Sequence, residues 1–150
     1  MLEDLLRGKV VFVGVGNPLL GDDGFGPSMA RGIPGAINAG SVPENFASKI
    51  SREKPDTVVI FDAVDFGGRA GEIRVFDPSD TRSPNVSTHS LPLSKFAEAL
   101  KPATVLLVGI QPRGITFGEP ISEEVAAGAN ALQGEIGGWL KRKPPRVDAR

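Results

Sequence analysis

Three short apolar runs, all rich in β-branched residues, constrain the fold of this chain more than any other feature. They cover residues 9–15, 57–62 and 103–110, and none of them alternates polar with apolar side chains. Unbroken runs of this kind are typical of parallel strands that helices cover on both faces. The chain is therefore predicted to be an α/β protein built on a mostly parallel, twisted sheet.

Weaker patterns supply the remaining elements of the predicted fold. Residues 72–76 alternate polar and apolar side chains, as an edge or antiparallel strand does, and residues 36–39 suggest a further short strand. Helical patterns fall at residues 23–32, 43–53, 91–100 and 122–140, with Ser41 and Ser90 as expected caps of the second and third. Because strands alternate with helices, we expect a three-layer sandwich of about five strands with helices on both faces.

Length and charge limit the possible partners. The 150 residues fit a single domain over residues 1–140, followed by a basic, solvated tail at residues 141–150. The net charge of −1 gives no reason to expect nucleic acid as a partner. No apolar run approaches the roughly 20 residues that cross a bilayer, and the charged start lacks the apolar stretch of a signal peptide. We expect a cytoplasmic monomer that does not insert into membranes.

Acidic residues and the only histidine lie close to the predicted strand ends. They are Asp22 and Asp23 after the first run, Asp62 and Asp65 at the end of the second, and His89 after a long polar loop at residues 77–88. Ligands of open α/β sheets bind at the carboxyl ends of the strands, so these side chains are expected to share one edge. Carboxylates and an imidazole on separate segments suit a first-row divalent metal, and the absence of cysteine excludes thiolate ligands.

The residues alone leave simpler roles open for each of these side chains. Asp22 and Asp23 equally suit the capping of a helix, and Asp62 suits a strand-end turn with Asp65. His89 equally suits a capping or surface position in its Ser- and Thr-rich surroundings. The sequence thus indicates an acidic cluster at one edge of the sheet without deciding its function.

Three other classes of site are disfavoured. Gly14 and Gly16 begin a dinucleotide-binding pattern, but Leu19 occupies its third glycine position and the acidic pair would repel a pyrophosphate. The Gly-x-Ser-x-Gly turn of many serine hydrolases is absent from the sequence, and both Ser41 and Ser90 have simpler roles as helix caps. Neither Asp23 nor Asp62 stands in the Asp-Thr/Ser-Gly context of an aspartic protease.

Five motifs in series give the chain a family resemblance. They are Gly14-Val-Gly-Asn-Pro-Leu-Leu-Gly-Asp-Asp-Gly24 with Gly26, Asp62-Ala-Val-Asp65, Pro78 after the strand that opens at Gly71, Thr88-His-Ser-Leu-Pro92, and Gly109-Ile-Gln-Pro112. In order and spacing they resemble the hydrogenase maturation endopeptidases. Members of this family remove a C-terminal extension from the large-subunit precursor of nickel–iron hydrogenases.

The resemblance implies a role for each candidate residue. Asp23, Asp62 and His89 match the family's nickel ligands and are the expected metal-binding and catalytic residues, whereas Asp22 is expected to be structural. The partner would be a nickel-loaded hydrogenase large-subunit precursor, and the nickel is either held by the protein or supplied by that substrate. The resemblance is poorer around residues 38–41, a region that could shape substrate contacts.

Two other functions remain open from the residues and the resemblance. A non-catalytic nickel-binding or chaperone-like maturation factor of the same fold would bind the precursor but leave its length unchanged. A metal-dependent phosphohydrolase would need a basic residue beside the acidic loop, and Arg113 is the only candidate.

Overall fold

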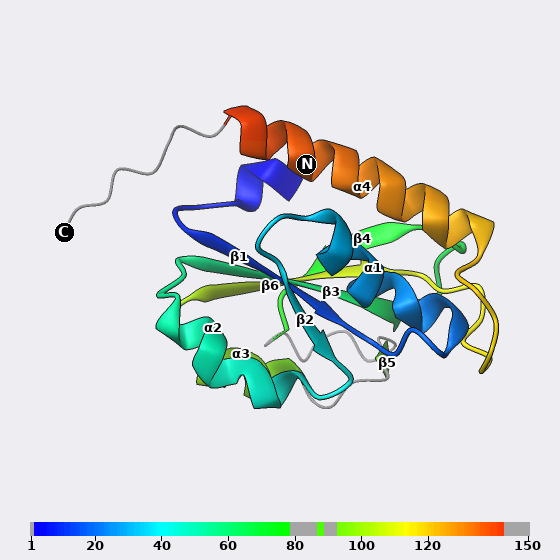
Figure 1. The fold of residues 1–150 in the computed structure, drawn as a ribbon, viewed down its shortest axis with the longest axis horizontal. Helices are drawn as coiled ribbons and strands as arrows, with labels where there is room; N and C mark the ends of the chain where they lie inside the picture. Colours follow the sequence, from blue (N-terminus) through cyan, green and yellow to red (C-terminus); the bar gives the residue numbers. More distant parts are fainter. Residues whose placement is uncertain (1, 79–86, 89–92, 143–150) are drawn as a thin grey trace.

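The structure is a computed structural model that describes residues 2–78, 87–88 and 93–142, with only the backbone at 87–88 (Figure 1). Its elements, with η for a 3-10 helix, are η1 (Leu2–Leu5), β1 (Val10–Val15), η2 (Gly21–Gly24), α1 (Phe25–Gly32), β2 (Ile37–Gly40), η3 (Pro43–Phe46), α2 (Ala47–Arg52), β3 (Thr57–Asp65), β4 (Ile73–Phe76), β5 (Ser87–Thr88), α3 (Leu93–Ala99), β6 (Thr104–Ile110) and α4 (Glu123–Arg142).

The main sheet has the strand order β2-β1-β3-β6-β4. Its first four strands are parallel, and β4 joins the edge antiparallel to β6. The short β5 pairs antiparallel with the carboxyl end of β3, where Thr88 lies opposite Val64. The prediction of a mostly parallel sheet of about five strands with an antiparallel edge at residues 72–76 is therefore confirmed.

Helices cover the sheet on both faces, as Figure 1 shows with α1 and α4 on one side and α2 and α3 on the other. One core cluster lies between the sheet and α1 and α4, and includes Phe12, Phe25, Phe61, Val125 and Leu132. A second cluster faces α2 and α3, and includes Val13, Ile50, Ile60, Leu93 and Phe96. Because both faces are covered, eight of the nine residues of β3 are buried, which explains its unbroken apolar run.

Several boundaries differ from the predicted ones. The helix expected over residues 43–53 is divided into η3 and α2, and the position before it is Val42 without a side-chain cap, so the prediction that Ser41 caps this helix is wrong. Ser90, the other expected cap, lies outside the described residues. Helix α4 continues through Arg142, whose guanidinium donates to Glu3 at 2.6 Å. In the described part of the chain, no helix combines the length and hydropathy needed to cross a membrane.

Candidate functional site

Two buried carboxylates lie at the carboxyl edge of the sheet. Asp23 belongs to η2, directly after the β1 loop, and Asp62 lies near the end of β3; their exposed fractions are 3% and 0%. The elements that carry them are in contact, because η2 packs against β3. Folding therefore brings together two segments that are about 40 residues apart in the chain, as the strand-end argument predicted.

His89, the third predicted site residue, lies outside the described residues. Its chain neighbour Thr88 pairs with Val64, two positions beyond Asp62 on β3. Among the described residues, no three His, Cys, Asp or Glu side chains are grouped so as to hold a metal ion. The three-ligand site formed by Asp23, Asp62 and His89 therefore stays a prediction.

The two carboxylate oxygens of Asp23 differ in the partners that the described residues offer them. Its Oδ2 accepts a hydrogen bond from the backbone N–H of Asn17 at 2.8 Å, and Asn17 Oδ1 accepts from the N–H of Leu19 at 2.9 Å. Its Oδ1 is buried, and no hydrogen-bond donor reaches it from the described part of the chain. A buried carboxylate oxygen normally has a partner, so this atom fits a role as ligand to a cation.

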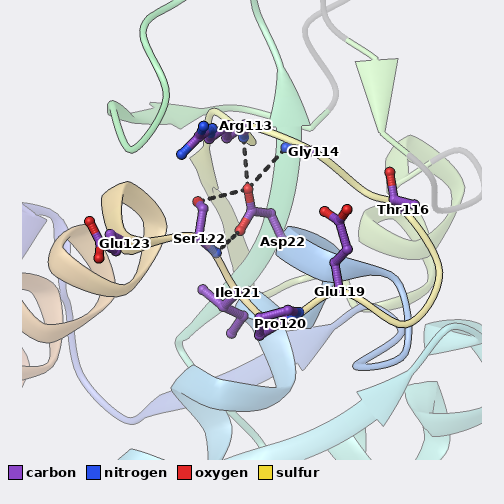
Figure 2. Close-up of a pocket in the computed structure, with 9 residues that line it drawn as sticks. All are labelled: Asp22, Arg113, Gly114, Thr116, Glu119, Pro120, Ile121, Ser122 and Glu123. Carbon is purple, nitrogen blue, oxygen red and sulfur yellow. Dashed lines mark hydrogen bonds between the residues drawn. The ribbon is translucent and has the colours of Figure 1, made fainter.

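Asp22, although adjacent, is fully engaged in holding the structure together. Its carboxylate accepts from the N–H groups of Arg113, Gly114 and Ser122 at 2.7, 3.1 and 2.7 Å, and from Ser122 Oγ at 3.0 Å (Figure 2). Ser122 Oγ in turn accepts from the N–H of Val125 and so caps the start of α4. Asp22 thereby fixes the segment between β6 and α4 against η2.

The capping role considered for the acidic pair is wrong for α1. The residue before this helix is Gly24, and it makes no side-chain cap hydrogen bond. Both aspartates belong instead to η2, the 3-10 turn that precedes α1. Their side chains are available for the two different roles described above because neither is used at the start of α1.

A polar cavity of about 650 Å³ lies beside Asp22 and is shown in Figure 2. Its walls are formed by Asp22, Arg113, Gly114, Thr116, Glu119, Pro120, Ile121, Ser122 and Glu123. The Arg113 guanidinium pairs with Glu124 at 3.5 Å, and therefore offers no clear support for a phosphate site at the acidic loop. Sequence reasoning named Arg113 but gave no indication of this cavity.

Gln111 has a structural role that the sequence did not reveal. Its buried Oε1 accepts from the N–H groups of Phe66 and Gly68 at 2.8 and 3.1 Å, so it holds the turn after β3. Its Nε2 donates to Asp65 Oδ1 at 3.1 Å. This amide, together with the N–H of Gly67, holds the pKa of the Asp65 carboxyl below its ordinary value. Asp65 thus helps to hold the turn that follows β3 in place.

Glycines of the first sequence motif, in the β1 loop and at the start of α1, allow close backbone packing. A Cβ atom at Gly16, where φ is +144°, would overlap with the carbonyl oxygen of Asp23. A Cβ at Gly26 would overlap with the backbone of Val15 and approach Phe61 O to 2.6 Å. Both contacts place the η2–α1 segment directly on β1 and β3, which explains the glycines without a nucleotide.

Comparisons with known proteins agree with this architecture. A model of the hydrogenase maturation protease family matches residues 34–137. The hydrogenase 3 maturation protease of Escherichia coli K12 is 34% identical over 139 residues, which cover 86% of this chain and 89% of that protein. The crystal structure of a [NiFe] hydrogenase maturation protease, HycI, from Thermococcus kodakarensis is 37% identical and superposes with a TM-score of 0.82 over 94% of this chain and 99% of that one. The solution structure of the endopeptidase HycI from E. coli is 31% identical, with a TM-score of 0.77 over 89% of this chain and 92% of that one.

Proposed function

This chain belongs to the hydrogenase maturation protease family, and from that membership we propose that it removes the C-terminal extension of a nickel-loaded hydrogenase large-subunit precursor. The peptidase class follows from the family. The proposal adds the identity of the substrate, its nickel-loaded state, and recognition of that nickel through Asp23, Asp62 and His89. The nickel enters the reaction as part of the substrate.

The observation that carries the proposal is the asymmetric environment of Asp23. One carboxylate oxygen is oriented by the N–H of Asn17, while the other is buried without a donor among the described residues. The side chain is thus positioned by the protein and keeps an oxygen for a ligand. Asp62, fully buried on the neighbouring β3, supplies a second carboxylate on a rigid strand.

These residues would act by selecting and positioning the loaded precursor. Two carboxylates and a neutral imidazole suit a first-row divalent ion whose other ligands come from the precursor. A metal ion bound there can polarise a scissile carbonyl or activate water. The anchoring of Asp23 by Asn17, and of Asp62 by its strand, would fix the two carboxylates and, through the ion, orient the loaded precursor, which would favour cleavage at one bond.

Processing of a purified precursor tests the proposal. We expect release of the C-terminal peptide from the nickel-loaded precursor, seen as a mass decrease by mass spectrometry, and no release from the nickel-free precursor. Asp23→Asn, Asp62→Asn and His89→Ala should each lower the processing rate by at least about a hundredfold, the scale of losing a ligand or a positioned catalytic group.

Asp56→Asn is the matched control for these variants. Asp56 adjoins the opposite end of β3, where its Oδ2 accepts from the N–H of Lys9, and an asparagine oxygen can accept the same hydrogen bond. The Asp56→Asn variant should therefore process the precursor at the wild-type rate. If His89→Ala or Asp23→Asn processes the precursor at the wild-type rate, the assignment of these residues to the site is wrong. A protein that binds the precursor but leaves its mass unchanged would instead be the non-catalytic maturation factor.

A further inference from the structure

Two large apolar side chains project into solvent next to the candidate site. Phe117 is 73% exposed and Leu19 is 58% exposed, which makes them the two most exposed large apolar residues in the described part of the chain. Most such side chains are buried in a folded protein, and adjacent exposed ones commonly mark an interaction surface. We call Leu19 and Phe117 together the loop patch.

The two loops that carry the loop patch are joined directly. The N–H of Gly118 donates to the carbonyl oxygen of Leu19 at 2.8 Å. Phe117 directly precedes Gly118, so this hydrogen bond joins the loop of Phe117 to the loop of Leu19. The N–H of Asp22 also donates to Gly114 O at 2.9 Å. Together with the carboxylate of Asp22, these bonds fix both loops, so the loop patch is held in place by a network of hydrogen bonds.

The loop patch is continuous with the candidate site. Leu19 belongs to the turn in which Asn17 orients Asp23, because Asn17 accepts from the N–H of Leu19 and donates to Asp23. On the other loop, Thr116 and Glu119 flank the patch and line the 650 Å³ cavity. A polypeptide bound at Asp23 would therefore pass close to an apolar surface and a polar hollow on one edge of the sheet.

We propose that the loop patch is a docking surface for an apolar segment of the precursor polypeptide, adjacent to the part that carries nickel. The inference rests on the proposed function and names how the protein substrate is held. Two carboxylates and an imidazole recognise an ion alone, whereas apolar side chains on a rigid platform add contact area and select a polypeptide of suitable shape. Solvent exposure of Phe117 and Leu19 is unfavourable in the free protein, and the precursor would remove it.

Binding and processing are measured on the full-length protein with Leu19→Ser, Phe117→Ser and the double variant. The backbone bond between Gly118 and Leu19 is kept in all three, and thermal unfolding checks that each variant folds. Leu5→Ser is the matched control, because Leu5 is 44% exposed and lies before β1, at the opposite edge of the sheet. The probe is the purified nickel-loaded precursor, with Kd measured by biolayer interferometry and KM and kcat by mass spectrometry.

We expect each single variant to raise the Kd and KM for the precursor about tenfold, and the double variant more, with kcat changed less than about twofold. Leu5→Ser should match the wild type. If the double variant binds and cleaves like the wild type, the docking surface is wrong while the proposed function stands. If the wild type binds through the loop patch without cleaving, docking holds and the peptidase proposal fails.

Two further outcomes overturn the inference. A wild-type protein that neither binds nor cleaves the precursor removes both the docking surface and the proposed function. Sedimentation velocity tests a second copy of the chain as the occupant. A dimer that the double variant abolishes, with an unchanged Kd for the precursor, would assign the loop patch to self-association.

Discussion

Asp22 and Asp23 are neighbours of the same residue type, and their surroundings give them different roles. The carboxylate of Asp22 accepts four hydrogen bonds from the segment that leads into α4. Asp23 accepts one from Asn17 and keeps a buried oxygen without a donor among the described residues. The difference arises because successive side chains of a tight 3-10 turn point in different directions.

Replacement of Asp22 by alanine should destabilise the fold. The N–H groups of Arg113, Gly114 and Ser122 would lose their acceptor, and a buried donor left unsatisfied costs about 1–3 kcal/mol. Water can reach part of this segment and satisfy some of these donors, which limits the summed cost. We therefore expect the free energy of unfolding, measured in urea titrations, to fall by about 3 kcal/mol. Glu119→Ala, an exposed change on the same cavity, should stay within about 0.5 kcal/mol of the wild type. Equal stabilities of the two variants would contradict the structural role of Asp22.

The packing of α1 against the sheet decides where the site lies. Gly26, in the first turn of α1, approaches the backbone of β1 and β3 more closely than any side chain would allow. This contact sets the depth of η2 and hence of Asp23. Gly14 and Gly16, which resemble the start of a phosphate-binding loop, serve the same packing, because a Cβ at either position would overlap with the carbonyl oxygen of Gly26 or of Asp23.

Gly26→Ala should separate α1 from the strands. The added methyl group meets backbone atoms that cannot move aside, so the free energy of unfolding should fall by about 3 kcal/mol or more. Gly134→Ala in α4 is the matched control, since no atom of the described residues outside the adjoining helix backbone lies within 4 Å of its Cβ position. That variant should gain up to about 1 kcal/mol from helix propensity. Chemical denaturation of both proteins measures the contrast, and a neutral Gly26→Ala would show that the close approach is absent.

At the scale of the whole molecule, one sheet carries two hydrophobic cores. β1, β3 and β6 contribute side chains to both core clusters. If these strands unfold, the helices on both faces lose the apolar surface against which they pack. The bonds of Asp22 add a link between the first and last thirds of the chain. These connections favour a single cooperative transition.

Fluorescence probes on the two layers can measure this cooperativity. Trp139 packs edge-on against Phe12 at 6.2 Å between ring centroids and reports on the α4 layer. In a Trp139→Phe background, Phe46→Trp reports on the α2 layer, because Phe46 is a partly buried neighbour of that core. In each protein the fluorescence and far-UV circular dichroism transitions in urea should coincide. Loss of the Phe46→Trp signal at lower urea than the dichroism would show that the layers unfold separately.

Much of the fold was predictable because its causes are local. The β-branched runs of β1, β3 and β6 are visible within a few residues, and they indicate burial on both faces of the sheet. The alternation at residues 72–76 predicted an antiparallel edge strand, and β4 is one, although Ile73 and Phe76 are only half-buried and Val75 is exposed. The strand-end rule then placed Asp23 and Asp62 at one edge, which the structure shows. The family resemblance is confirmed by the comparisons. Nickel binding, the contribution of His89, the monomeric state, the cytoplasmic location and the division at residue 140 stay predictions.

The sequence by itself thus determined the layer order, the edge at which polar groups gather and the family. Only the tertiary structure decided which aspartate is anchored and which keeps a buried oxygen, what Gln111 holds, and where the apolar loop patch lies. The physical reason is distance along the chain. Asp22 accepts from N–H groups 91 to 100 residues away, and Gln111 reaches back 43 to 46 residues to the end of β3. No local pattern encodes such contacts, because they exist only after the parallel strands have brought their carboxyl ends together.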